Sequence, residues 1–316
     1  MRGARSVHRR EVAIGLDVGG TELKLGAVRA DGRRVVVADH VPMRGPTGFL
    51  SPDAVAAAAA RFAATCGVEA VAVGMAVAAA FDAGGAVAFA PNLAGWVGTT
   101  PALAVERATG RPAYALYDGH AALEGEAWLG AARGLRHAIL LVIGTGVGGA
   151  VLAEGRVVGG ADGLAGVFGY LPVAAGPGAA APLESLVGGP ALAARLSAAL
   201  GREATTRELF GAAASGTEPA RSILDQALEE LGVALAGAVS ILNPELVILG
   251  GGLGAAFASH GERLEETMRR CGQPVSGRRA RVVAAALGND AGWLGAARVA
   301  LRRYRRTALA GPSPGS

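Results

Sequence analysis

Apolar residues recur along the chain in two patterns: short runs of Val, Ile, Leu and Ala, and longer Ala-rich stretches interrupted by charged residues. The short runs predict β-strands and the longer stretches predict α-helices. A first series contains strands at Val12–Asp17, Leu23–Val28, Val35–Ala38, Ala70–Met75 and Ala113–Tyr117, and helices at Asp53–Thr65 and Ala121–Leu129. A second series contains strands at Ala138–Ile143, Gly149–Ala153, Arg156–Val158, Leu246–Leu249 and Val282–Ala285, and helices at Ala191–Leu200, Pro219–Leu242, Leu253–Arg270 and Asp290–Arg306. Because strands and helices alternate, an α/β protein is predicted.

The first strand pair of each series has the same pattern. Residues 14–28 read IGLDVGGTELKLGAV and residues 141–152 read LVIGTGVGGAVL. Each is a strand, a glycine-rich tight turn and a second strand. Because glycine has no Cβ, such a turn lets backbone N–H groups approach a phosphate. The duplication predicts two lobes that grip a polyphosphate from opposite sides.

Length and composition also favour two lobes. A chain of 316 residues exceeds the size at which one core stops growing. With 51% hydrophobic and 18% charged residues, it has enough apolar material to bury. The apolar runs end well before about 18 residues, so no bilayer-spanning segment is predicted, and no apolar signal core follows the Arg-rich start. We expect a soluble cytoplasmic protein that does not bind a membrane.

The formal net charge of +4 arises at the chain ends. Four arginines lie within residues 1–10 and four within 302–306, and removing these eight charges from +4 leaves −4 for residues 11–301. A nucleic-acid partner needs a basic face, so none is predicted. Cys66 and Cys271 lack the spacing of a metal site, and neither a disulfide framework nor a thiolate zinc site is predicted.

Five motifs follow one another along the chain: DVGGT at 17–21, PNLAGW at 91–96, GTGVGG at 144–149, NPELVILGGG at 243–252 and LGNDAG at 287–292. Together they resemble the ROK family of sugar kinases and repressors, within the actin-like ATPase superfamily. The resemblance covers about residues 12–301. The repressor branch carries an N-terminal helix-turn-helix, for which the ten residues before Glu11 leave no room, so the kinase branch is favoured.

This resemblance implies a two-lobed actin-like ATPase fold of the ribonuclease H-like type, with a duplicated phosphate-binding unit. We expect a small lobe over residues 11–117, completed by a returning helix at about 291–308, and a large lobe over 118–290. Residues 1–10 and 309–316 are expected to be flexible tails. A homodimer is also expected.

ATP and Mg²⁺ are the cofactors that the resemblance implies. Asp17 would orient Mg²⁺ through water, although it also suits a plain turn residue. Lys24 either neutralises phosphate or lies on a solvated strand face. The backbone expected to face the transferring phosphate is Gly19, Gly20 and Thr21. The nucleotide phosphates are assigned to Gly144, Thr145 and Gly146, and the nucleoside to Gly250, Gly251 and Gly252, which otherwise form only a strand-to-helix turn.

Asp118 is the expected catalytic base, since it follows a strand where the family has a catalytic aspartate and could accept the proton of a primary hydroxyl. It also suits the N-cap of the following helix, and the two roles are compatible. The acceptor-binding residues that the resemblance implies are Asn92, Asp118, His120, Val167, Tyr170 and Glu184.

Several of these positions depart from the family pattern. Tyr117 and His120 replace the asparagines that flank the catalytic aspartate, and Val167 and Tyr170 replace a Glu and a His that touch the sugar. The family's zinc-binding cysteines are replaced by the Ala/Gly/Pro stretch 174–181, so no zinc site is expected.

The predicted function is an ATP-dependent kinase acting on the primary, 6-type hydroxyl of a hexose-like substrate. Because a carboxylate has been replaced by Val167, a modified sugar or C7-cyclitol of specialised metabolism, of the kanosamine or valiolone type, is favoured over glucose. The alternatives are a glucokinase or N-acetylhexosamine kinase, and a sugar-responsive regulator that retains the kinase fold.

Overall fold

The computed structural model describes residues 10–45, 48–93, 95–176 and 178–310. The chain divides into two compact units. The first contains the chain up to Arg133, the segment Gly159–Ala165 and the chain from Asn289 onward, and the second contains Gly134–Val158 and Gly166–Gly288.

The division differs from the expected boundary at residue 117. Helix α4 (Asp118–Leu129) packs on the C-terminal helix α12 (Ala291–Ala310) and so belongs to the first unit. Most of both expected flexible tails, residues 1–9 and 311–316, lies outside the described residues, whereas residues 309 and 310 are the last of α12.

A five-stranded sheet forms the centre of the first unit, in the order β3-β2-β1-β6-β9. β1 is antiparallel to β2 and parallel to β6, and β6 is parallel to β9. β1 and β6 are buried almost throughout, in agreement with their nearly continuous apolar sequences. The bounds are β1 Val12–Val18, β2 Glu22–Arg29, β3 Arg34–Pro42, β6 Ala70–Val77 and β9 Ala113–Tyr117.

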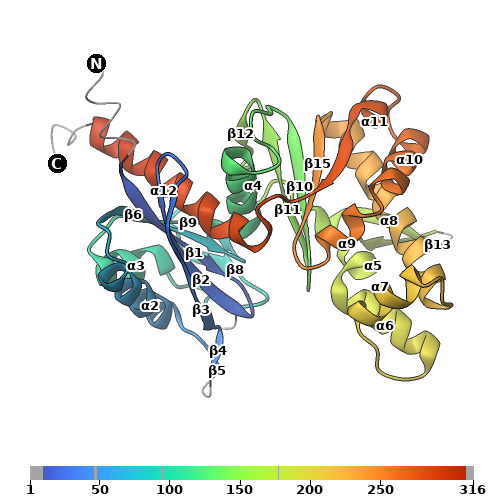
Figure 1. Cartoon of the computed structure of the whole chain (residues 1–316), viewed down its shortest axis with the longest axis horizontal. Helices are drawn as coiled ribbons and strands as arrows, with labels where there is room; N and C mark the ends of the chain where they lie inside the picture. The colour runs from blue at the N-terminus through green and yellow to red at the C-terminus, as the bar shows by residue number, and fades with distance from the viewer. Residues whose placement is uncertain (1–9, 46–47, 94, 177, 311–316) are drawn as a thin grey trace. The chain divides into compact units, whose positions relative to one another are not determined.

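Helix α12 lies along β1 and β6 (Figure 1) and is unusually close to both strands. A Cβ at Gly15 or Gly74 would overlap the backbone carbonyls of Trp293 and Ala296. Glycine at these positions therefore brings α12 against the sheet. The other helices of the unit are α2 Pro52–Thr65 and α3 Pro101–Thr109, which pack on each other. Its short strands are β4 Arg44–Gly45, β5 Gly48–Phe49, β7 Ala80–Phe81 and β8 Val87–Phe89.

The second unit repeats the strand order of the first, as β12-β11-β10-β15-β16. As in the first unit, the central strand β10 is antiparallel to β11 and parallel to β15, and β15 is parallel to β16. The predicted duplication is therefore confirmed at the level of the sheets. The bounds are β10 Ala138–Ile143, β11 Val147–Ala153, β12 Arg156–Val157, β15 Leu246–Gly250 and β16 Arg281–Ala284.

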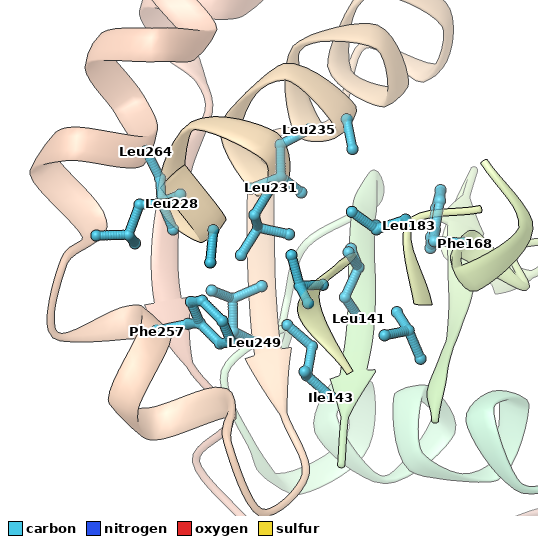
Figure 2. Close-up of a cluster of buried hydrophobic side chains, with 14 of the residues drawn as sticks. Leu141, Ile143, Phe168, Leu183, Leu228, Leu231, Leu235, Leu249, Phe257 and Leu264 are labelled. Carbon is cyan, nitrogen blue, oxygen red and sulfur yellow. The ribbon is translucent and has the colours of Figure 1, made fainter. Parts of the chain in front are cut away.

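Helices pack on this second sheet around an apolar core (Figure 2). Leu231 and Leu235 of α8 lie in the same cluster as Leu141 and Leu249 of the strands. The bounds of the helices are α5 Glu184–Val187, α6 Gly189–Leu200, α7 Thr206–Ala214, α8 Ala220–Leu242, α9 Gly254–Ala258, α10 Gly261–Cys271 and α11 Ser276–Arg279. The remaining short elements are β13 Pro172–Gly176, β14 Ala179–Pro182, and the 3₁₀ turns η1 Phe168–Tyr170 and η2 Gly288–Asp290. Within the described part of the chain, no helix is long and apolar enough to cross a membrane.

One predicted helix is wrong in its extent. The helix predicted over 253–270 is two helices, α9 and α10, separated at Ser259 and His260. The Ser259 hydroxyl donates to the Ala256 carbonyl at 2.6 Å, and such a bond competes with the continuing backbone ladder. The predictions also missed α3 and α7, which have only nine residues each.

Candidate functional site

The first glycine turn (Gly19, Gly20, Thr21) connects β1 to β2 and borders a pocket. The Gly19 amide donates to the Glu22 carbonyl at 3.2 Å and closes the turn. The pocket measures about 460 Å³. Its lining residues are Asp17, Gly19, Gly20, Thr21, Glu22, Lys24 and Pro42. The structure therefore brings together the residues that the sequence assigns to the transferring phosphate.

Asp17 is a partly buried carboxylate of this pocket. Burial, together with the neighbouring Asp118 carboxylate, raises the pKa of Asp17 to about 7, although Lys24 opposes the shift. Lys24 lies opposite Asp17 in the β1–β2 register, and its Nζ donates to the Asn289 carbonyl at 3.3 Å. Lys24 thus lies on strand β2, and its positively charged side chain lines the pocket.

Sequence reasoning missed the contact between Asp17 and the start of α12. A Cβ at Gly292 would lie 2.6 Å from an Asp17 carboxylate oxygen. The carboxylate is therefore packed against the first turn of α12, where the helix dipole favours negative charge. The LGNDAG motif contained this signal, because it places a glycine at the beginning of the helix.

Asp118 is the first residue of α4 and directly follows β9. Because β1, β6 and β9 are parallel, the carboxyl ends of these strands lie at one edge of the sheet, which brings Asp118 near Asp17. Burial raises the pKa of Asp118 to about 6, and the Gly119 amide, which donates at 2.8 Å, opposes this. The predicted N-cap role is displaced by one residue, since the N-cap is Tyr117.

Asn92 lies at an exposed position beside the first glycine turn. If Gly20 carried a Cβ, that atom would lie 3.5 Å from the Cβ of Asn92. Two fully buried residues, Leu93 and Trp96, anchor the loop, and the Trp96 indole donates to the Leu50 carbonyl at 2.9 Å. Residue 94 of the predicted sugar-contacting motif lies outside the described residues.

His120 occupies a different environment from the one expected for a substrate contact. Its side chain is buried, and Nε2 lies 2.8 Å from the Ala165 carbonyl. The Tyr117 ring meets it edge-on, with the ring centroids 5.3 Å apart. Burial lowers the pKa of His120 below its usual value. Nε2 is therefore engaged with the protein, which leaves Nδ1 as the remaining ring nitrogen for any contact with a ligand.

The second glycine turn (Gly144, Thr145, Gly146) connects β10 to β11 and is held by Glu184. Glu184 Oε2 accepts a hydrogen bond from the Val147 amide at 2.8 Å. A Cβ at Gly146 would lie 2.6 Å from the same oxygen. The sequence predicts Glu184 as an acceptor contact, but it does not predict this bond to the phosphate-binding turn.

Helix α6 begins against the same turn. The Gly189 amide, in its first turn, donates to the Gly144 carbonyl at 2.8 Å. A Cβ at Gly144 would meet nothing within 4 Å, so this side of the turn is open. An open backbone turn beside a helix N-terminus suits phosphate groups.

The predicted nucleoside motif lies next to the second glycine turn. Gly250 ends β15, and Gly251 has a φ of +81°. A Cβ at Gly251 would overlap the Ile143 carbonyl, which also accepts from the Leu253 amide at 3.0 Å. Gly252 follows in open space. This strand-to-helix turn therefore packs directly on the end of β10.

The acceptor loop (Gly166–Tyr170) packs on β11. Phe168 is buried, and a Cβ at Gly149 would lie 2.7 Å from its ring. Val167 is half-buried, whereas 65% of Tyr170 is exposed. Phe168 thus anchors the loop, and Tyr170 is directed to solvent.

The donor set suits Mg²⁺. Asp17 and Asp118 are neighbouring, partly buried carboxylates, and a divalent cation would offset their mutual repulsion. Mg²⁺ is usually held by one or two carboxylates, water and phosphates, so it does not require a larger cluster. Among the described residues, no group of three or more His, Cys, Asp or Glu side chains could hold a metal ion. In the Ala/Gly/Pro stretch 174–181, where no zinc ligand is predicted, residue 177 lies outside the described residues.

This chain is similar to known proteins over most of its length. The model of the ROK family matches residues 13–303. A glucokinase from Thermotoga maritima is 31% identical over 92% of this chain and 97% of its own length. The bifunctional enzyme NanE/NanK of Brucella melitensis is 38% identical over 61% of this chain, and the match spans 36% of that protein, about a third of its length.

A solved structure provides a match over nearly the whole chain. The ROK family glucokinase from Streptomyces griseus, in complex with glucose and AMPPNP, aligns with a TM-score of 0.73 and 28% identity. The alignment covers 92% of this chain and 99% of that one. The predicted actin-like ATPase type of fold is confirmed.

Proposed function

The chain belongs to the ROK family, and on this premise we propose that it is a sugar kinase that transfers the terminal phosphoryl group of ATP to the primary, 6-type hydroxyl of a hexose-like acceptor. The observation that supports this most strongly is the position of Asp118 beside Asp17, at the edge where the parallel strands of the first sheet end. Glucokinases similar to this chain over most of their length support the same activity.

Asp118 performs the acid–base part of the reaction. With a pKa of about 6 it is ionised at neutral pH and basic enough to accept the acceptor's hydroxyl proton. As that proton moves to Asp118, the hydroxyl oxygen bonds to the terminal phosphorus, and the bond from phosphorus to the ADP oxygen breaks. Orientation of the hydroxyl by a fixed carboxylate reduces the entropic cost of this step.

The two glycine turns contribute backbone N–H groups for the phosphates. Lys24 adds a positive charge at the first turn, and Glu184 fixes the second turn through Val147. Asp17 would hold Mg²⁺ through water. When bound, Mg²⁺ neutralises phosphate charge. We expect no structural zinc, and stoichiometric zinc in protein purified without added metal would contradict this.

The acceptor is proposed to be a modified sugar or C7-cyclitol of the kanosamine or valiolone type. A valine at position 167 offers no hydrogen bond, and a site lacking a polar partner disfavours the hydroxyl that would need it. A homodimer also remains a prediction, which light scattering would test.

A panel of acceptors tests the proposal. Glucose, N-acetylmannosamine, kanosamine and a valiolone-type cyclitol are each incubated with ATP and Mg²⁺, and products are identified by mass. A phosphorylated product supports the kinase. Acceptor binding without phosphorylation of any member would support the regulator, and strong preference for glucose would contradict the proposed acceptor.

The double variant Val167→Glu with Tyr170→His tests the acceptor loop. Restoring two polar contacts is expected to raise kcat/KM for glucose relative to the native acceptor. The corresponding change in transition-state free energy between the two acceptors is about 1–3 kcal/mol. Both changes are made together because a lone carboxylate could destabilise the loop. An unchanged ratio in the folded variant would contradict the role of these two residues.

A further inference from the structure

The segment Gly159–Ala165 is a compact loop of the first unit. The Ala165 amide donates to the Gly159 carbonyl at 3.0 Å and closes the loop. Gly160 and Gly163 have φ values of +76° and +70°, which glycine adopts readily. The next residue in the chain is Gly166, the first residue of the acceptor loop.

His120 holds the end of this segment. The Ala165 carbonyl can only accept, so the bond at 2.8 Å requires the proton on Nε2. His120 lies in the first turn of α4, as Asp118 does, and its ring contacts Tyr117, the residue before Asp118. One buried side chain therefore joins the turn that carries the base to the backbone that leads into the acceptor loop.

Gly166 transmits this constraint to the loop. It has a φ of +89°, and a Cβ there would lie 2.7 Å from the Ala150 Cα on β11. Ala165 and Gly166 are thus fixed on both sides of one peptide bond, by His120 and by β11. Without the His120 bond, the peptide that precedes Val167 would be held on one side only, by β11.

We propose that His120 is a positioning residue for the acceptor, whose bond to Ala165 holds the segment that leads into the acceptor loop on the first turn of α4. This inference rests on the proposed function. It assigns His120 a role through Ala165, in place of the direct substrate contact that the sequence predicts. Nucleotide binding should be insensitive to it, because among the described residues no hydrogen bond joins either glycine turn to His120 or Ala165.

Two variants separate the hydrogen bond from the bulk of the side chain. His120→Leu fills the space without a donor, whereas His120→Gln retains a donor at a similar reach. Thr267→Val is the matched control, because Thr267 is a buried polar residue of α10 that bonds Glu229 in the second unit. The measurements are steady-state kinetics with ATP and the panel acceptor that wild-type protein phosphorylates best, and hydrogen–deuterium exchange of the unliganded protein.

His120→Leu is expected to raise the KM for this acceptor about tenfold, with the KM for ATP within about twofold of wild type. Amides of residues 159–167 should exchange faster. His120→Gln should restore both properties substantially, and Thr267→Val should leave both unchanged. Wild-type exchange in His120→Leu, an equal rise of both KM values, or failure of glutamine to rescue would overturn the proposal.

The same data distinguish this proposal from the proposed function. If wild-type protein phosphorylates none of the acceptors, the kinase assignment fails, and the acceptor role of His120 fails with it. Exchange of residues 159–167 would still show whether His120 holds the segment. If wild-type protein is active and only exchange changes in His120→Leu, the kinase stands and the acceptor role is overturned.

Discussion

The two five-stranded sheets have the same strand order and the same pairing directions, yet different chemical groups follow their equivalent strands. In the first unit, Asp17 lies near the end of β1 and Asp118 follows β9. In the second unit, Gly144 follows β10 and Ala285 follows β16. The repeated architecture thus carries carboxylates in one copy and small neutral residues in the other.

This difference indicates a division of labour between two similar folds. The first glycine turn adjoins two carboxylates and Lys24, groups suited to a metal ion and a reacting hydroxyl. The second turn is open, adjoins a helix N-terminus and is fixed by Glu184, which suits phosphate oxygens. Chemistry should therefore depend on the first unit and nucleotide affinity on the second.

The strongest test of this comparison neutralises the base. Asp118→Asn should lower kcat by roughly 10²-fold or more, because the amide cannot accept the proton. Nucleotide affinity should be unchanged, since Asp118 is assigned to the acceptor hydroxyl and not to the nucleotide phosphates. Steady-state kinetics and calorimetry with an ATP analogue measure the two effects. Asp53→Asn, an exposed carboxylate in the first turn of α2, is the control. Near-normal turnover would refute the role of Asp118.

The pH profile tests the same carboxylate without a mutation. Because the pKa of Asp118 is raised to about 6, the active ionised form is lost as the pH falls through that value. We expect kcat/KM for the acceptor to decrease about tenfold per pH unit below pH 6, because kcat/KM reports the free enzyme. The rate is measured from pH 5 to 8 at saturating ATP and at acceptor concentrations well below KM. A profile that is flat down to pH 5 would contradict this assignment.

Glu184 tests the second unit. Glu184→Ala removes the acceptor for the Val147 amide and should raise the KM for ATP about tenfold. Glu184→Gln retains an acceptor oxygen, so its KM for ATP should remain near wild type while its KM for the acceptor rises. If both variants affect ATP equally, the charge matters rather than the hold on the turn.

The smallest expected effect concerns stability. The pKa of Asp17 is raised to about 7 in the folded protein against an ordinary value of 3.8. The folded state therefore favours the neutral acid, and stability is lost as the pH rises from about 4 through 7. At pH 8 without Mg²⁺, Asp17→Asn should raise Tm by roughly 2–4 °C. Thermal unfolding at pH 4 and pH 8 measures this, and an equal difference at both values would contradict the burial of this charge.

Local sequence determined the strands of both sheets, most of the longer helices and the duplicated hairpin. Apolar runs such as Val12–Val18 and Ala138–Ile143 predict strands, because continuous burial in a parallel sheet requires continuous apolar residues. The five motifs and the ROK resemblance were also present in the sequence, and the family is confirmed. These features depend on neighbouring residues, which a linear pattern contains.

Only the tertiary structure decided which side chain bonds which backbone group. The bond from His120 to Ala165 spans 45 residues of sequence and that between Glu184 and Val147 spans 37. No spacing rule predicts such pairs, because they depend on how the sheets and helices pack. The same holds for Gly292 against Asp17, where a contact across the fold requires glycine. Local sequence thus determined the identity of the reactive groups, whereas packing determined their burial, their pKa values and their partners.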